Sequence, residues 1–316
     1  MLGTIVGLIV LILVTALFGW LTRKAWGAAR GWLKWLGILL AALLTLLFAL
    51  MTVVGAVGTY RLFRAYSVTV PEVTVAGTPE QIARGEHLAD VLCAGCHSLE
   101  GDLPMSGGGN LSDDAGMPLG DIYAPNITPA GDIRDMSDAT LFRLLRTGVS
   151  QEGRATAMTS ITGPRALSDE DTLAVIAYLR QAPPIEHETP AFKPSILMAL
   201  LTGAGLVPMD VPPAVSPVTV AAKAPSLEYG EYVMDYMDCT SCHGPKLDGA
   251  VAPPFPAGPN LQADLYAWSQ QQFVDEINTH AASAKPEEVM PWEDVSRLDA
   301  IELEALYLWL HQIASQ

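Results

Sequence analysis

The sequence predicts an all-α protein in which a hairpin of two membrane-spanning helices precedes two small helical modules of similar plan. Three observations predict it: two long uncharged apolar stretches at the N-terminus, helix-capping patterns along the rest of the chain, and a motif of two cysteines and one histidine that occurs twice. No alternation of apolar and polar residues, the pattern of half-buried strands, competes with them. We expect the hairpin over residues 1–66, the first module over 67–184, a proline-rich connector over 185–226 and the second module over 227–316.

The first 66 residues have the composition of a membrane anchor. They contain no Asp or Glu, and residues 2–21 and 35–60 carry no charge at all. Each stretch reaches the roughly 20 residues that a helix needs to cross the hydrocarbon core of a bilayer. Residues 1–21 lack the basic segment of a secretory signal peptide, so we expect both stretches to be retained as transmembrane helices.

Basic residues predict the orientation of this hairpin. The connection between the apolar stretches holds four of them, against two just after the second stretch, Arg61 and Arg64; the four are Arg23, Lys24, Arg30 and Lys34. Short basic loops stay in the cytoplasm. The hairpin is therefore expected in the cytoplasmic (inner) membrane, with everything after Tyr60 on the periplasmic, extracytoplasmic side.

The rest of the chain is strongly acidic. Residues 67–316 contain 12 basic and 34 acidic side chains, a formal charge of −22. This sign disfavours nucleic acid as a partner, because nucleic-acid-binding surfaces are basic.

All four cysteines belong to two C-x-x-C-H motifs, Cys93-Ala-Gly-Cys96-His97 and Cys239-Thr-Ser-Cys242-His243. This motif attaches c-type haem: the thiols bond to the porphyrin vinyl groups and the histidine is the proximal iron ligand. A redox dithiol or half a zinc site would explain one C-x-x-C pair, but not a histidine after both pairs with no cysteine left over. The sequence predicts two covalently bound haem c groups. Covalent haem attachment takes place outside the cytoplasm, in agreement with the predicted orientation.

The two modules share one order of elements. In each, a helix leads into the first cysteine, a loop rich in Gly and Pro follows, and two further helices complete the module. Helix starts are predicted at Thr78, Ser137 and Ser168 in the first module, and at Ser269 and Asp299 in the second. Within the last helices, Tyr178-Leu179 and Tyr307-Leu308 are expected to occupy equivalent places.

The sixth iron ligand decides what a c-type haem can do, and a Met thioether in that position favours electron transfer. Met290 is the only Met after His243 and lies nine residues before Asp299; Met158 lies ten residues before Ser168. We therefore expect the iron ligands to be His97 with Met158 and His243 with Met290. The competing candidates are Met105, Met117 and Met136 in the first module and His280 in the second.

The connector is not one regular element, since residues 182–226 contain nine prolines. Within it, residues 195–207 are apolar but too short to span a bilayer. We expect a helix packed between the two modules; the alternative is a docking surface for a partner subunit or for the membrane.

Residues 84–184 resemble the haem modules in the cytochrome c subunits of membrane-bound alcohol and gluconate dehydrogenases. The matching residues are Ala124-Pro-Asn-Ile-Thr-Pro129, Leu144-Leu-Arg-Thr-Gly-Val149, Met158, and Leu167-Ser-Asp-Glu-Asp-Thr-Leu173 with Ala177-Tyr-Leu179. The second module is similar to class I cytochrome c through Cys242-His-Gly244, Gly258-Pro-Asn-Leu261 and Met290-Pro-Trp292. The resemblance implies two class I cytochrome c domains in which the Met of each pattern is the sixth ligand.

The layout departs from those dehydrogenase subunits, which usually have three haem modules and no such hairpin. It looks more like the dihaem subunit of a high-affinity haem–copper oxidase, or like cytochrome subunits that link a quinol-oxidising complex to an oxidase or photosynthetic reaction centre. We therefore expect an electron-transfer subunit of a respiratory or photosynthetic membrane complex, whose partners are the other subunits and a basic soluble redox carrier. The alternatives are the electron-accepting subunit of a periplasmic alcohol or sugar dehydrogenase and a dihaem peroxidase. A Met in both modules counts against the peroxidase, and we expect no separate catalytic site.

Overall fold

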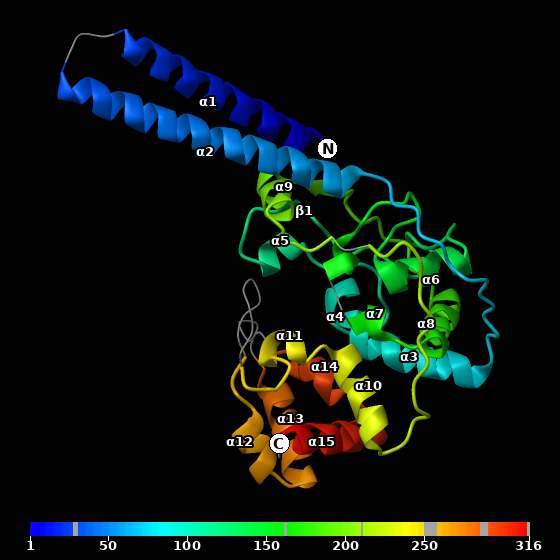
Figure 1. Ribbon diagram of the computed structural model, residues 1–316. Helices are drawn as coiled ribbons and strands as arrows, with labels where there is room; N and C mark the ends of the chain where they lie inside the picture. The colour runs from blue at the N-terminus through cyan, green and yellow to red at the C-terminus, as the bar shows by residue number, and fades with distance from the viewer. Residues whose placement is uncertain (28–30, 161–162, 210, 250–257, 285–289, 315–316) are drawn as a thin grey trace.

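The computed structural model describes residues 1–27, 31–160, 163–209, 211–249, 258–284 and 290–314. The chain is mostly helical, as predicted. In the described residues the only sheet pairs β1 (Gly120–Asp121) with β2 (Lys193–Pro194) in antiparallel register. Figure 1 shows a long helical hairpin projecting from a body in which the helices of residues 79–181 lie nearer the hairpin and those of residues 227–314 lie farther from it.

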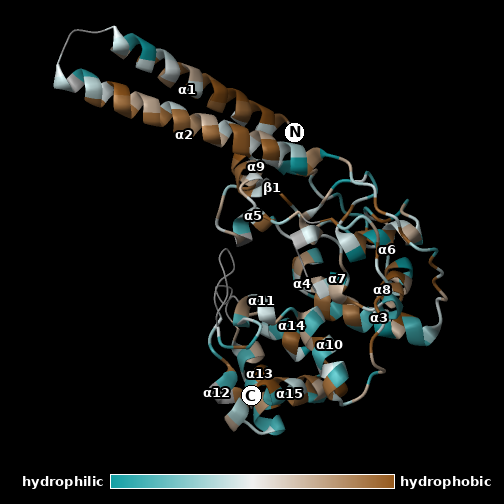
Figure 2. Cartoon of the chain, in the orientation of Figure 1, coloured by the Kyte–Doolittle hydropathy of each residue, from teal (hydrophilic) through white to brown (hydrophobic). Residues whose placement is uncertain are grey.

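The hairpin consists of α1 (Leu2–Trp26) and α2 (Trp32–Phe63), both long and apolar enough to cross a membrane. They run side by side, with Phe18 stacked on Phe48 at 5.6 Å. Most of their apolar side chains are exposed, and Figure 2 shows the hairpin as the most hydrophobic part of the chain. An apolar surface of this size needs a cover such as lipid, which is consistent with membrane anchoring.

The first module begins and ends with long helices that pack on each other, α3 and α8. Its helix starts lie where the capping residues predict: Thr78, Ser137 and Ser168 each accept a hydrogen bond from a backbone N–H of the first turn. The helices are α3 (Pro79–Leu92), α4 (Ala94–His97), α5 (Leu111–Asp114), α6 (Asp138–Thr147), the 3₁₀ helix η1 (Ala157–Ser160), α7 (Gly163–Ala166) and α8 (Asp169–Gln181).

The second module repeats this plan with α10 and α15 as its long helices. Ser269 and Gln272 form the capping box of its middle helix, and Asp299 caps its last helix through the N–H of Glu302. The helices are α10 (Leu227–Met237), α11 (Thr240–His243), α12 (Gln262–Ala267), α13 (Gln270–Ser283), α14 (Trp292–Ser296) and α15 (Ala300–Ala314).

The same glycine-mediated helix crossing occurs in both modules. A Cβ atom at Gly85 of α3 would lie 1.8 Å from the Ala174 carbonyl oxygen of α8, and one at Gly230 of α10 would lie 2.0 Å from the Ala305 carbonyl oxygen of α15. Only glycine permits backbones to approach so closely.

This crossing corrects the predicted register of the last helices. The aromatic residue beside Gly85 is Tyr178, and the one beside Gly230 is Trp309. Trp309-Leu310, rather than Tyr307-Leu308, is therefore equivalent to Tyr178-Leu179. Tyr178 and Trp309 each lie ten residues after the helix cap, whereas Tyr307 is two residues too early and packs on Phe273.

The apolar segment of the connector forms α9 (Ile196–Gly203), and it packs against the hairpin. A Cβ at Gly58 of α2 would lie 1.7 Å from the Ala199 carbonyl oxygen, and one at Gly203 would lie 1.9 Å from the Val54 carbonyl oxygen. Arg61 donates a hydrogen bond to the Thr202 carbonyl. The expectation that this segment packs between the two modules is wrong, because small residues on α2 and α9 let these two helices come together instead.

Candidate haem sites

His97 lies in the short helix α4, and the structure fixes its ring through one nitrogen. Nδ1 lies 2.8 Å from the carbonyl oxygen of Pro125, an atom that can only accept, so Nδ1 carries the proton. Burial lowers the pKa of His97 below its usual value, which favours the neutral ring. Nε2 is then the nitrogen with a lone pair, in the form that binds iron.

His243 in α11 has the same arrangement. Its side chain is buried, and Nδ1 lies 3.0 Å from the carbonyl oxygen of Pro259. The neighbouring Gly258 donates its N–H to the Cys242 carbonyl, and a Cβ there would lie 2.7 Å from Nδ1 of His243. The loop can approach this ring closely because residue 258 has no side chain.

A second contact repeats around the two histidines. The carbonyl of His97 accepts a hydrogen bond from Gly107 N–H, and the carbonyl of His243 accepts one from Gly249 N–H, both at 2.8 Å. In each module the loop after C-x-x-C-H therefore folds back onto the histidine. The two prolines belong to the dipeptides Pro125-Asn126 and Pro259-Asn260. The sequence shows these dipeptides, but it does not show that their proline carbonyls contact the histidines.

The two asparagines after these prolines have different surroundings. Asn126 is fully buried, and its amide nitrogen donates to the carbonyls of Ile185 at 2.8 Å and His187 at 3.1 Å. Its Oδ1 accepts from the N–H and the hydroxyl of Thr128. Asn260 is exposed and accepts from the N–H of Gln262. The first loop is thus tied to the connector through Asn126.

The four cysteines form no disulfide. Cys93 closes α3 and is buried, Cys96 is exposed, and Cys239 and Cys242 are partly buried. Burial raises the pKa of the Cys93 and Cys239 thiols to about 12.

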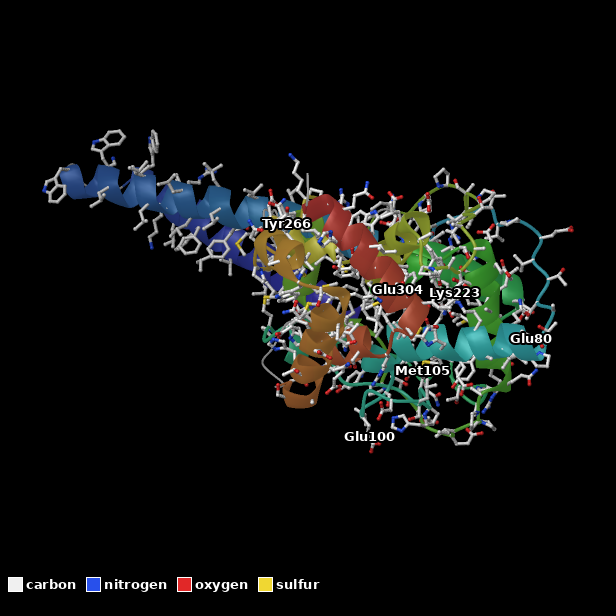
Figure 3. The ribbon with its side chains drawn as sticks, turned by 90° about the horizontal axis from the view of Figure 1, so that it is seen from below. Glu80, Glu100, Met105, Lys223, Tyr266 and Glu304 are labelled. Carbon is white, nitrogen blue, oxygen red and sulfur yellow. The ribbon has the colours of Figure 1, made fainter. Side chains whose placement is uncertain are left out.

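The two methionines expected as sixth ligands are both partly buried and lie just before α7 and α14. Met158 is in η1, where its N–H bonds to the Thr156 hydroxyl, and the Met290 side chain packs against the main core. His280 stacks flat on Trp292 with ring centroids 4.4 Å apart and lies 3.8 Å from Glu276. Met105, labelled in Figure 3, is buried in the core of the first module.

One buried polar group near the second motif has no hydrogen-bond partner among the described residues, the hydroxyl of Tyr236 in α10. Tyr236 lies three residues before Cys239 and packs edge-on against Tyr232 at 5.1 Å. Buried hydroxyls are nearly always paired. The unpaired Tyr236 hydroxyl is consistent with a bound group that the protein itself does not supply.

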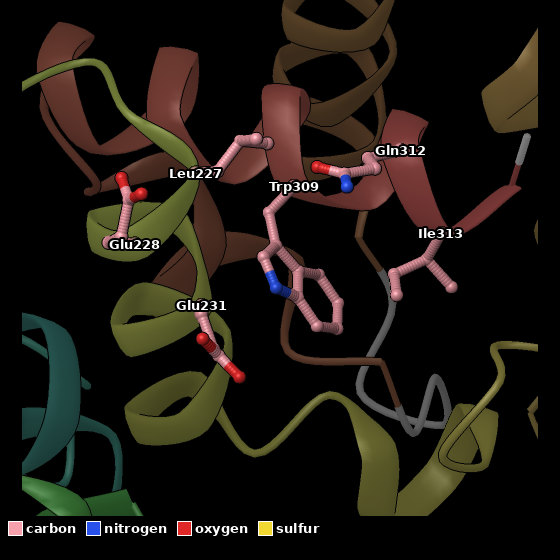
Figure 4. Close-up of a pocket in the computed structure, with 6 residues that line it drawn as sticks. All are labelled: Leu227, Glu228, Glu231, Trp309, Gln312 and Ile313. Carbon is pink, nitrogen blue, oxygen red and sulfur yellow. The ribbon is translucent and has the colours of Figure 1, made fainter.

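Figure 4 shows a surface pocket between α10 and α15, with the Trp309 indole at its centre. Its lining is Leu227, Glu228, Glu231, Trp309, Gln312 and Ile313. None of these residues belongs to a C-x-x-C-H motif, so this pocket is separate from the candidate haem sites.

Comparisons with known proteins match the region of the first candidate site. Residues 82–183, from α3 to just beyond α8, match the family model described as cytochrome c. The cytochrome c subunit of gluconate 2-dehydrogenase from Pantoea cypripedii is 32% identical over 176 residues, which cover 52% of this chain and 38% of that protein. The chain therefore matches less than half of the length of that relative.

The matched region contains the first C-x-x-C-H motif, the Pro125 loop and the Gly85 crossing. A cytochrome c domain implies covalently bound haem c and a role in electron transfer. Residues 82–183 are a cytochrome c domain, in a chain that resembles the cytochrome c subunits of dehydrogenases.

Proposed function

We propose that this chain is a membrane-anchored dihaem cytochrome c, a resident electron-transfer subunit of a respiratory or photosynthetic complex. It passes electrons between a quinol-oxidising complex or a soluble carrier and a terminal oxidase or reaction centre. The observation that carries the proposal is the repeated histidine geometry, in which Nδ1 of His97 and of His243 each meets a proline carbonyl. When bound, each haem supplies an iron that gains and loses one electron.

The residues present fit two haems. Cys93 and Cys96, and Cys239 and Cys242, are the thiols for covalent attachment, and His97 and His243 are the proximal ligands. The proline carbonyls orient both rings and keep Nε2 unprotonated, the role that a hydrogen-bond acceptor behind a ligating histidine has in metal sites. The second site is proposed because it repeats the glycine crossing and the histidine contact of the first.

We assign Met158 and Met290 as the sixth ligands. Their support is the matched spacing to the caps of α8 and α15, and the engagement of the rival His280 with Trp292 and Glu276. A thioether on both irons leaves no open position for peroxide, which argues for electron transfer over peroxidase chemistry.

We place the hairpin in the cytoplasmic membrane and the haem modules on its outer side. The exposed apolar surfaces of α1 and α2 support the anchor, and the basic connection between them supports the orientation. At the connection, Lys24 lies over the Trp20 ring and Trp26 packs on Trp35, the pairing of basic and aromatic residues typical of a membrane interface.

A second candidate is the electron-accepting cytochrome of a periplasmic alcohol or sugar dehydrogenase. The gluconate 2-dehydrogenase relative favours it, while the hairpin and the two motifs favour the first candidate. Purification of the chain in mild detergent and identification of the proteins that remain bound separates the two: an oxidase or quinol-oxidising complex supports the first, a dehydrogenase the second. A haem content below two per chain would overturn the dihaem proposal.

A further inference from the structure

The two modules contact each other through side chains at equivalent positions. In each module, one of these residues comes just before the crossing glycine, and a second lies two positions after that glycine. The third lies three residues after the cap of the module's last helix. The three equivalent pairs are Arg84 and Tyr229, His87 and Tyr232, and Asp171 and Glu302.

Two of these pairs exchange contacts across the interface. His87 Nε2 of the first module lies 2.6 Å from Oε2 of Glu302 in the second. In return, the Tyr232 hydroxyl of the second module donates to Oδ2 of Asp171 in the first at 2.7 Å. Each contact runs from the first long helix of one module to the last helix of the other.

Arg84 lies at the centre of the exchange and holds both acids. Its Nε and Nη2 donate to the two carboxylate oxygens of Asp171 at 2.9 and 2.8 Å, and its Nη1 donates to Glu302 at 2.6 Å. Nη2 also lies 3.1 Å from the hydroxyl of Tyr229, the equivalent residue of the other module. Glu302 is fully buried; burial alone would raise its pKa, but hydrogen bonds from His87 and Arg84 outweigh burial and hold the pKa well below its usual range.

The acids are not arranged as a metal site, although His87, Asp299 and Glu302 offer three ligand atoms within 4.8 Å of one another. Lys223 from the connector places its ammonium group between Asp299 and Glu302. Figure 3 shows Lys223 labelled beside α15, near Glu304. A protein cation therefore already neutralises this cluster.

A second set of contacts joins segments beside each C-x-x-C-H motif to the other module. Arg297, just after α14, donates to the carbonyls of Asp90 at 3.0 Å and Gly101 at 2.9 Å, on either side of the first motif. In the opposite direction, Gly163 at the start of α7 lies so close to α10 that a Cβ there would be 2.5 Å from the Tyr236 carbonyl oxygen. The segment after each Met candidate thus contacts the helix end that leads to the other attachment motif.

Exchange of equivalent contacts is the property of a two-fold, self-complementary interface between identical subunits. We propose that the two modules dock as an internal pseudo-dimer through this interface, and that Arg84, Asp171 and Glu302 are positioning residues that fix the separation of the two haem-attachment motifs. This inference rests on the proposed second haem. A fixed separation makes electron exchange between the two irons uniform from molecule to molecule.

The test uses the full-length, haem-loaded protein in detergent. Haem content is measured first, and fewer than two haems per chain overturns the proposed function and this inference with it. Pulsed dipolar EPR between the two oxidised low-spin irons then gives their distance distribution. Wild type is expected to show one narrow distance, and Arg84→Gln a broad distribution with slower electron equilibration between the haems after flash reduction.

Two further variants keep the test independent of gross misfolding. Tyr232→Phe removes only the hydroxyl that reaches Asp171 and should broaden the distribution less than Arg84→Gln does. Arg134→Gln is the matched control, because Arg134 pairs with Glu186 on the exposed surface within the first module and its connector. Two haems with the same narrow distance in wild type, Arg84→Gln and Tyr232→Phe would overturn the pseudo-dimer.

Discussion

At the scale of single residues, the two candidate haem sites share one geometry but differ in how firmly it is held. The loop that carries Pro125 is anchored by the buried Asn126, whereas the loop that carries Pro259 has the exposed Asn260 at the same place. The Asn126 side chain donates a hydrogen bond to a carbonyl of the connector and accepts one from a backbone N–H of its own loop. The first site therefore depends on a buried polar network around Asn126, whereas Asn260 at the second site is exposed to solvent.

This difference predicts unequal effects of one substitution. Asn126→Ala removes a fully buried amide that bonds to the Ile185 and His187 carbonyls and to the donors of the buried Thr128. We therefore expect a loss of about 2–4 kcal/mol in the free energy of unfolding. Asn260→Ala, the matched control, should cost about 0.5 kcal/mol or less, as exposed positions usually do. Chemical unfolding followed by circular dichroism measures both. Equal losses would show that Asn126 does not anchor its loop.

The assignment of the sixth ligands gives a second prediction at this scale. Met290→Ala and Met158→Ala should each open one iron, so that the reduced protein binds one carbon monoxide per chain, seen in the Soret difference spectrum. Met136→Leu is the control, because Met136 packs against the core of the first module. If Met290→Ala leaves both haems inert to carbon monoxide, His280 becomes the ligand in the second module.

At the scale of elements, α9 joins the membrane anchor to the haem modules. It packs on α2 through glycines. Strand β2, just before α9 in the chain, pairs with β1 of the first module. The orientation of the body relative to the membrane therefore depends on the contact between α9 and α2.

Gly58→Val tests this contact. The added side chain would collide with the Ala199 carbonyl, 1.7 Å from its Cβ, so α9 must move away from α2. We expect the amides of residues 196–203 to exchange with deuterium faster, while the amides of α3 and α8 stay unchanged. Gly37→Val is the control on the same helix, since nothing lies within 4 Å of a Cβ at Gly37. Identical exchange of α9 in both variants would contradict the contact.

The elements divide clearly into those that the sequence predicts and those that it does not. Helix starts at Thr78, Ser168 and Ser269 were predictable because a cap is a contact between residues three apart. The equivalence of Trp309 with Tyr178 and the packing of α9 on α2 were not predictable. Both depend on which glycine contacts which backbone carbonyl in the folded chain. The same holds for the histidine contacts: C-x-x-C-H names the ring, but the Pro125 carbonyl comes from 28 residues away.

At the scale of the whole molecule, charge and hydropathy are separated along its length. The apolar, basic hairpin lies at one end and the body with a formal charge of −22 follows it, with the second module farthest from the hairpin (Figure 1). A chain built in this way has two routes for electrons: through permanent neighbours beside the hairpin and α9, or through a diffusing partner that approaches the body. The field of an acidic body attracts basic surfaces and repels acidic ones.

These routes predict different responses to salt. A basic soluble carrier would react with the body at a second-order rate that falls steeply as ionic strength rises, because the Debye length shortens from about 30 Å at 0.01 M to about 8 Å at 0.15 M salt. Transfer between permanently bound subunits should hardly change over that range, because their contact does not depend on diffusional encounter. We expect salt-independent oxidation or reduction of at least one haem, since the exposed apolar surface of the hairpin suits a resident subunit. Flash or stopped-flow kinetics of both haems across a salt series, with an uncharged chemical reductant as control, measures this. If both haems react only with an added soluble carrier, and only at low salt, the resident-subunit proposal is wrong and the acidic body is a docking surface for a mobile carrier.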